Sequence, residues 1–176
     1  MRILGKWEFN VYNDCDFINN DNKLVYINVL SSNFTNYVKK DDGGGAIHLI
    51  NCGIHCNNTV FIDCVSSSGG GGAIYINNSF SIENNATFID VLFLRCKAVF
   101  GGALFISAYS NLFDIVLTGC HFESNEALLY TQPKNENNHL FGGAAIYIMS
   151  RNINVVNCTF LLNKGPKGAV KIYNKF

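Results

Sequence analysis

The stretch Gly69–Asn78 reads GGGGAIYINN, in which four glycines lead directly into an alternating aliphatic segment. A phosphate-binding loop would continue with Lys-Ser/Thr and a helix, and neither follows these glycines. Similar segments begin at Gly44 (GGAIHLI), Gly101 (GGALFIS), Gly143 (GAAIYIM) and Lys167 (KGAVKIY), with a weaker copy, KLVYIN, at Lys23. The first large aliphatic residues of the five clear copies lie 27, 30, 42 and 24 residues apart. The stretch is therefore predicted to be one copy of a repeat, in which glycine forms a bend before each strand.

A second landmark, a phenylalanine, alternates with the glycine segments. The phenylalanines are Phe17, Phe34, Phe61, Phe93, Phe122 and Phe160. Three of them have asparagine three residues later (FxxN), and two have cysteine there (FxxC). Hydrophobic residues around both landmarks alternate with the period of two that is typical of strands, and no helical period is present. Short strands in coils of about 24–30 residues predict a single all-β domain over residues 1–176, a parallel β-solenoid of about six coils.

The composition argues against several classes of partner. Thirteen Lys and Arg balance thirteen Asp and Glu, which argues against binding to nucleic acid. No apolar run approaches the roughly 18 residues of a membrane-spanning helix, and the start, MRILGKWEFN, lacks the apolar core of a signal peptide. The one metal-like cluster, His48, Cys52, His55 and Cys56, has no second Cys/His pair at zinc-finger spacing. We therefore predict no nucleic-acid partner, no integral membrane segment, no metal and no cofactor.

The alternation of GGA[ILV] and FxxN segments over residues 15–173 resembles the repeats of the polymorphic membrane proteins, known from chlamydial surface autotransporters and from protist surface families. This resemblance implies a single-stranded, right-handed parallel β-helix with an adhesive role at a cell surface or outside the cell. The partner that it implies is a protein or glycan of a host or a neighbouring cell. The chain departs from the family pattern at Phe61 and Phe93, which carry FxxC.

An outward-facing column is predicted between the paired aliphatic residues of each coil. It consists of Tyr26, His48, Tyr75, Phe105, Tyr147 and Lys171. Stacked coils would present these side chains as an exposed, mostly aromatic stripe. Such a stripe suits contact with a glycan or a protein partner, because aromatic rings offer a large contact area at low entropic cost. The alternative is that the rings only pack on one another over the sheet.

The longest coil predicts a projecting loop over residues 126–141. This coil contains about a dozen more residues than its neighbours. The candidate contact residues of the loop are Gln132, Lys134, Asn135 and His139. Insertions in solenoids often carry binding, although a polar insertion is also simply tolerated.

Four of the seven cysteines would be neighbours on adjacent coils. Cys64 and Cys96 each lie three residues after a phenylalanine, and Cys120 and Cys158 each lie two residues before one. Neighbours about 4.8 Å apart are within reach of a disulfide. We therefore predict either ladders of free buried thiols or, if the chain is secreted, the disulfides Cys64–Cys96 and Cys120–Cys158.

These features favour a non-enzymatic scaffold of surface or adhesion type. The alternative is a polysaccharide-active enzyme, a lyase or a hydrolase. Such an enzyme needs carboxylates that converge on one face, whereas Asp63, Asp90 and Asp114 occupy different columns of the repeat. A further alternative is an orphaned repeat fragment without a specific activity. No residues after GAVKIYNKF could cap the last coil, so we expect a longer protein, a partner or end-to-end self-association to cover it.

Overall fold

The computed structural model describes residues 15–20, 24–41, 43–79, 84–108, 110–128 and 142–173, and within them every regular element is a strand. All strand pairs are parallel, and the strands form four sheets. Sheet A contains β1 (Cys15–Ile18), β5 (Ile47–Ile50), β9 (Ile74–Asn78), β13 (Leu104–Ala108), β17 (Ile146–Met149) and β20 (Val170–Ile172). Sheet B contains β2 (Tyr26–Leu30), β6 (Gly53–Asn57), β10 (Asn85–Ile89), β14 (Asp114–Thr118) and β18 (Asn152–Val156). Sheet C contains β3 (Asn33–Thr35), β7 (Val60–Ile62), β11 (Leu92–Leu94), β15 (His121–Glu123) and β19 (Thr159–Leu161). Sheet D contains β4 (Val38–Lys39), β8 (Val65–Ser66), β12 (Lys97–Ala98) and β16 (Glu126–Ala127).

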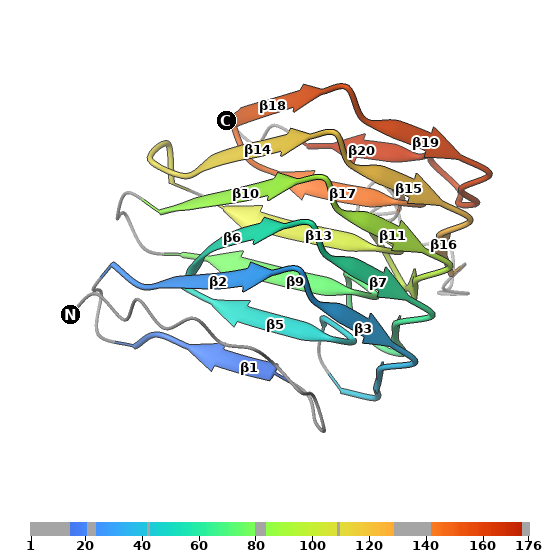
Figure 1. Ribbon diagram of the computed structural model, residues 1–176, viewed down its shortest axis with the longest axis horizontal. Coiled ribbons are helices and arrows are strands. Elements are labelled where there is room, and N and C mark those ends of the chain that lie inside the picture. The colour runs from blue at the N-terminus through green and yellow to red at the C-terminus, as the bar shows by residue number, and fades with distance from the viewer. Residues whose placement is uncertain are drawn as a thin grey trace, which may run out of the picture.

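The chain winds through sheets A, B, C and D in turn and then starts the next coil. Figure 1 shows β2 and β3 running from left to right on the near side and β5 returning behind them, while the chain rises from its N-terminal to its C-terminal end. This winding is right-handed. The predicted all-β parallel solenoid is therefore confirmed, and its coil count differs slightly from six because the sheets hold six, five, five and four strands. The described residues contain no helix long and apolar enough to cross a membrane.

The first coil has a different register from the predicted one. Phe17 was grouped with the other phenylalanines, but it pairs with Leu49 in sheet A. The weak glycine-segment copy at Tyr26 instead forms β2, where Tyr26 pairs with Gly53 in sheet B. Both assignments were therefore wrong: the Tyr26 segment lies in sheet B instead of sheet A, and Phe17 lies in sheet A instead of sheet C. Both strands alternate with the same period, and no glycine pair precedes Cys15 to mark the bend.

The glycine pair of each repeat has two separate roles, which Gly71 and Gly72 illustrate. Gly71 has a φ of +64°, and a Cβ there would lie 2.0 Å from the carbonyl oxygen of Ile74. Gly72 lies against the next coil, so that a Cβ would be 2.2 Å from the carbonyl oxygen of Gly102. The first glycine therefore turns the chain, and the second lets two coils approach closely.

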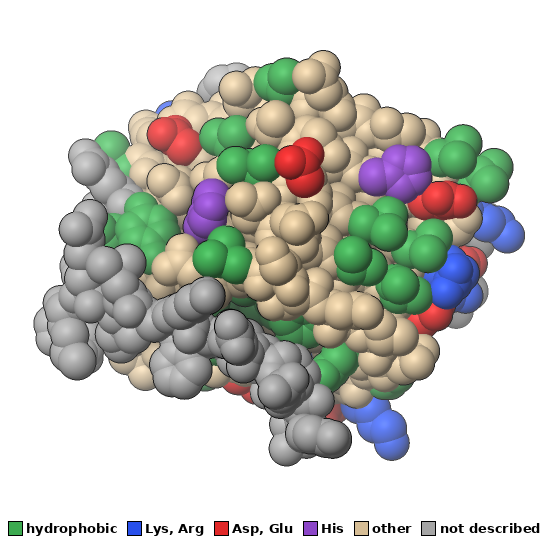
Figure 2. Space-filling model, viewed as in Figure 1, with side chains coloured by type: hydrophobic (Ala, Val, Ile, Leu, Met, Phe, Trp, Pro, Cys, Tyr) green, Lys and Arg blue, Asp and Glu red, His purple; other side chains and the backbone are tan. Residues whose placement is uncertain are grey.

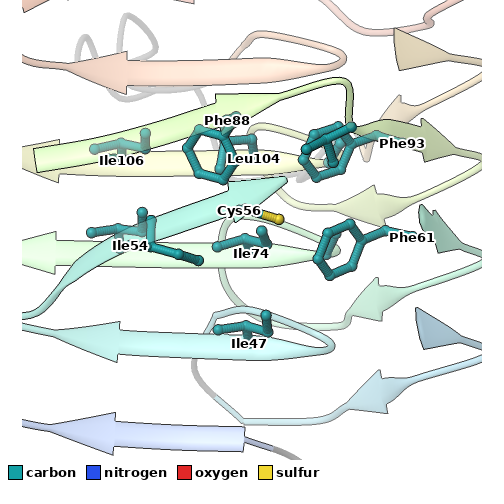
Figure 3. Packing of buried hydrophobic residues seen from close by; sticks show 14 of the residues in the cluster. Ile47, Ile54, Cys56, Phe61, Ile74, Phe88, Phe93, Leu104 and Ile106 are labelled. Carbon is teal, nitrogen blue, oxygen red and sulfur yellow. The ribbon is translucent and has the colours of Figure 1, made fainter. Parts of the chain in front are cut away.

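The phenylalanines of sheet C form a continuous stack in the core. Their ring centroids are 4.7 Å apart for Phe34–Phe61, 5.2 Å for Phe61–Phe93, 4.7 Å for Phe93–Phe122 and 5.0 Å for Phe122–Phe160. Figure 3 shows Phe61 and Phe93 at one end of the core, beside the aliphatic residues of sheets A and B. This stack explains why phenylalanine recurs in every coil: near-parallel rings fill the same volume at each level.

The third residue after each phenylalanine of sheet C occupies the corner that follows this sheet. The side chain of Asn125 accepts a hydrogen bond from the Cys96 amide, and it donates to the carbonyl of Phe93 at 3.0 Å. Cys96 occupies the same corner one coil earlier, where its Sγ lies 3.7 Å from the carbonyl of Phe61. FxxN and FxxC are therefore two forms of one corner, in which the side chain contacts the phenylalanine carbonyl of the preceding coil.

Candidate functional site

The predicted aromatic stripe is a stacked column on the outer face of sheet A. Its register partners in β5, β9, β13 and β17 are His48, Tyr75, Phe105 and Tyr147. Ring centroids are 5.0 Å apart for the first pair, 4.8 Å for the second and 5.6 Å for the third. Only 8% of His48, 5% of Phe105 and 1% of Tyr147 is exposed. Tyr75 is half-buried, so the prediction of an exposed stripe is wrong for the other three residues.

Glycines on the preceding coil explain why the column is buried. A Cβ on Gly43 would lie 2.1 Å from Cδ2 of Tyr75, and one on Gly70 would lie 2.8 Å from Cγ of Phe105. Each ring therefore lies over a position that has no side chain. Phe100 covers the column from the side, with its ring centroid 5.0 Å from that of Phe105. The period of two predicts the outward direction of these rings, but it does not show what covers them.

Tyr26 does not belong to this column, because it lies in sheet B and pairs with Gly53. The residue that the first coil contributes to the column is Asp16, the register partner of His48. At the other end, Lys171 follows Tyr147 as predicted. The column therefore begins with an acidic residue and ends with a basic one.

A groove of about 480 Å³ opens where the column is least covered. We call it the sheet A groove. Its walls include the side chains of His48, Tyr75 and Phe100, and Gly43 and Gly69 border it with backbone. Tyr75 and Phe100 are both half-buried, so parts of two aromatic rings face this space. The sequence analysis found the tyrosine and the histidine but missed Phe100, whose position directly before a glycine pair was the available signal.

A charged cluster lies beside the groove. Lys39 forms an ion pair with Asp16, and Nδ1 of His48 lies 3.0 Å from the same carboxylate oxygen, Oδ1 of Asp16. An ionised carboxylate only accepts hydrogen bonds, so Nδ1 of His48 is the donor. Burial acts to raise the pKa of Asp16, but the hydrogen bonds and charges of Lys39 and His48 outweigh it and hold that pKa below its usual range.

The metal-like sequence cluster does not assemble in space. Cys56 points into the core with 0% exposed, whereas His55, next to it in β6, faces outward from sheet B. His48 lies on the outer face of sheet A. Within the described residues, no group of three His, Cys, Asp or Glu side chains is arranged to hold a metal ion.

An apolar patch on the outer face of sheet C was missed by the sequence analysis. It consists of Val60, Ile62, Leu92 and Leu94, which are all half-buried and flank the stacked phenylalanines in β7 and β11. Figure 2 shows hydrophobic side chains gathered on this face, with charged side chains beside them. An ion pair, Arg95–Asp63 at 2.8 Å, and a contact between His121 Nε2 and Glu123 Oε2 at 3.1 Å border the patch. The sequences VFI and LFL contain the signal, because the residues on both sides of an inward phenylalanine face outward.

The predicted loop over residues 126–141 begins later than expected. The structure places Glu126 and Ala127 in β16, where they pair with Lys97 and Ala98 of β12. The predicted loop start at residue 126 was wrong because the chain first forms a strand of sheet D here, as it does in the preceding coils. The candidate contact residues Gln132, Lys134, Asn135 and His139 lie outside the described residues.

The six cysteines with described side chains are free thiols, and Cys158 alone among them is not fully buried. Cys64 and Cys96 are neighbours at the corner between sheets C and D; burial, followed by the adjacent Cys64, raises the pKa of Cys96 above its usual range. Burial also raises the pKa of Cys120 to about 12, with a smaller contribution from Cys158. The two predicted pairs are therefore adjacent, and they are present as thiols rather than disulfides.

Native thiol reactivity is expected to be confined to Cys158 among these six cysteines. Only the thiolate attacks a disulfide reagent, and at pH 8 a pKa of about 12 lowers the thiolate fraction roughly a thousandfold relative to an ordinary thiol. The measurement is the rate of reaction with Ellman's reagent in a Cys15→Ser background, which removes the one cysteine whose side chain is not described. One thiol should react rapidly, and Cys158→Ser should abolish that phase. A second rapid thiol in Cys15→Ser would contradict this expectation.

Comparison of the chain with protein-family models, with curated proteins and with solved structures finds no match to any of them.

Proposed function

We propose that this protein is a non-enzymatic scaffold of surface or adhesion type, which binds glycan chains of a host or a neighbouring cell in the sheet A groove. The observation that carries the proposal is the partly exposed ring of Tyr75 beside Phe100, with polar groups at the same groove. Protein sites for sugars combine an aromatic face, on which the apolar face of the sugar stacks, with a few well-placed hydrogen-bonding groups. His48 and Ser68 supply such groups along the groove.

The groove is held rigidly, which favours binding. Tyr75 lies between the rings of His48 and Phe105, and its own ring lies over Gly43. The Asp16 carboxylate holds the orientation of His48 through Nδ1. A binding surface that is already ordered loses little side-chain entropy when a ligand arrives.

The carboxylates of Asp16, Asp63 and Asp114 support binding rather than cleavage. Glycoside hydrolysis uses two carboxyl groups on either side of the scissile bond. Asp16, which contacts His48 beside the sheet A groove, is paired with Lys39 and has a lowered pKa that suits an anion rather than a proton donor. Asp63 lies at the border of sheet C and Asp114 lies in sheet B, so neither joins it.

Removal of the Tyr75 ring is expected to weaken glycan binding about tenfold or more. The probe is an array of neutral and acidic oligosaccharides, followed by calorimetric titration of the strongest binder. Tyr75→Ala should raise Kd by about a factor of ten, because the part of the Tyr75 ring that borders the groove beside Phe100 is lost. Tyr75→Phe retains the ring and should stay within about threefold of the unmodified protein.

Thr87→Ala is the matched control, because Thr87 faces outward from sheet B and lies outside the groove. Circular dichroism of each variant checks that the solenoid is intact. The proposal is overturned if no glycan binds, or if Tyr75→Ala binds as tightly as Tyr75→Phe.

A second candidate function is protein binding through the apolar patch of sheet C. A hydrophobic centre bordered by polar and charged side chains is the common anatomy of a protein interface. Attachment to cells that survives Tyr75→Ala without measurable glycan binding would favour this patch over the groove.

A further inference from the structure

A second groove, of about 350 Å³, lies where the chain enters the strands of sheet B. We call it the sheet B groove. The lining residues that matter here are Tyr26, Asn84, Asn85, Asn111, Asp114 and Asn152. None of these residues borders the sheet A groove, so the two sites are independent. The sheet B groove is strongly polar, with side-chain amides as its main component.

The absence of a side chain at Gly53 makes room for the Tyr26 ring that borders the groove. Tyr26 and Gly53 are register partners at the start of β2 and β6. A Cβ on Gly53 would lie 2.5 Å from Cε1 of Tyr26, so the tyrosine ring rests directly on the glycine. The same edge of the sheet continues as Asn85, Asp114 and Asn152, which are register partners on successive coils. One half-buried aromatic ring therefore stands at the end of a row of polar side chains.

Several polar groups at this groove have no partner within the described chain. The Oδ1 atom of Asn84 is buried without a hydrogen bond, and only 2% of this residue is exposed. Its Nδ2 atom donates to the carbonyl of Asn51 at 3.4 Å, which fixes the side chain. The side chains of Asn85 and Asp114 make no hydrogen bond or ion pair with the described residues. Buried polar atoms are nearly always paired in native proteins, so the unpaired acceptor of Asn84 calls for a donor from outside the described residues, which a water molecule or a ligand in the groove would supply.

The side chain of Asn152 is held in place at the groove. Its Nδ2 atom donates to the backbone carbonyl of Asn111 at 2.8 Å, and this hydrogen bond joins the first residue of β18 to the preceding coil. The side chain therefore lies along the groove with its orientation held. Asp114, between Asn85 and Asn152 in the register, is exposed and is the one charged residue among those that line the groove.

We infer that the sheet B groove binds a neutral sugar residue. The ring of Tyr26 offers a stacking face, while Asn85 and Asp114 lie one coil apart, about 4.8 Å, and reach adjacent hydroxyl groups of one sugar ring. A carboxylate accepts two hydrogen bonds, and an amide both donates and accepts, so together they match hydroxyl groups that do both. The negative charge of Asp114 disfavours an acidic sugar. This inference does not rest on the function proposed for the sheet A groove.

The inference is tested by NMR titration of the ¹⁵N-labelled protein with glucose, galactose, mannose and N-acetylglucosamine. The side-chain amide signals of Asn84, Asn85 and Asn152 are expected to shift with at least one of these sugars. Tyr26→Ala and Asp114→Ala should each raise the Kd read from these signals at least tenfold. Asp114 is exposed, so its substitution leaves the core untouched and remains informative if Tyr26→Ala is poorly folded.

Two controls separate this site from the sheet A groove. Thr118→Ala, on the same strand but away from the groove, should leave the titration unchanged. Tyr75→Ala should also leave it unchanged, so that either site can fail without the other. The inference is overturned if these amide signals do not move with any neutral sugar, if Asp114→Ala has no effect, or if glucuronic acid binds more tightly than glucose.

Discussion

Gly71→Asn is expected to abolish folding of the solenoid. Asparagine tolerates a positive φ, so the φ of +64° alone does not forbid the substitution. The new Cβ, however, would lie 2.0 Å from the carbonyl oxygen of Ile74 and 3.1 Å from the amide nitrogen of Phe105. Both contacts are with backbone, and the shorter one lies within the same coil, so the clash is relieved only if the bend itself changes its conformation. A loss of at least about 4 kcal/mol is expected, a large part of the stability of an ordinary domain.

Gly119→Asn is the matched control, because Gly119 has the same φ of +64°. The Cβ at this position would meet Oδ1 of Asp90 at 2.3 Å, which is the end of a side chain that can rotate away. The equivalent bend on other coils already holds Asn58 with φ 48° and Asn157 with φ 51°. We expect a change within about 1 kcal/mol, measured by urea denaturation followed by circular dichroism. Similar losses of stability in Gly71→Asn and Gly119→Asn would show that the positive φ, and not the backbone contact of the new Cβ, requires glycine at position 71.

Phe93→Ala is expected to destabilise the protein by about 3–5 kcal/mol. The ring of Phe93 is 0% exposed and stacks on Phe61 at 5.2 Å and on Phe122 at 4.7 Å. Its removal leaves a cavity in the middle of the stack, and the strands on either side cannot collapse into it because their register is held by both neighbouring coils. The measurement is the midpoint of urea unfolding with an unchanged m-value.

Phe160→Ala gives the comparison, since Phe160 belongs to the same stack but is half-buried and has one stacked neighbour, Phe122 at 5.0 Å. About 1–2 kcal/mol is expected for this variant, because less apolar area returns to water and the site opens to solvent. If both variants lost the same free energy, continuity of the stack would not be what stabilises the core.

The repeat pattern predicted the fold because a solenoid places equivalent residues at equivalent positions. Ile47, Ile74 and Leu104 were aligned from their sequence spacing, and they are register partners in sheet A. Phe61 and Phe93 were aligned in the same way and stack in the core. In these coils glycine pairs and phenylalanines mark two fixed points, so the register between them has little freedom.

The surface was much harder to predict, because exposure depends on atoms that are distant in sequence. Phe105 was expected to face solvent, yet Phe100 lies across it, and a missing side chain at Gly70 makes room for its ring. Tyr26 was assigned to the same column because the first coil lacks the glycine pair that marks the others. The tyrosine ring at each groove likewise lies over an absent side chain, at Gly43 and at Gly53, and a period of two carries no information about such gaps.

The step of 42 residues between Leu104 and Ile146 has a consequence for how such a molecule can evolve. This coil is the longest in the chain, and its ends still pair in register, Leu104 with Ile146 and Ile106 with Ile148. The packing of the core is thus unchanged when a coil contains a longer loop. A gene encoding this chain can gain, lose or lengthen a coil by tandem duplication or insertion while the remaining levels keep their packing. Each coil gained or lost then changes the distance between two surface sites along the solenoid axis by about 4.8 Å, and this change is inherited.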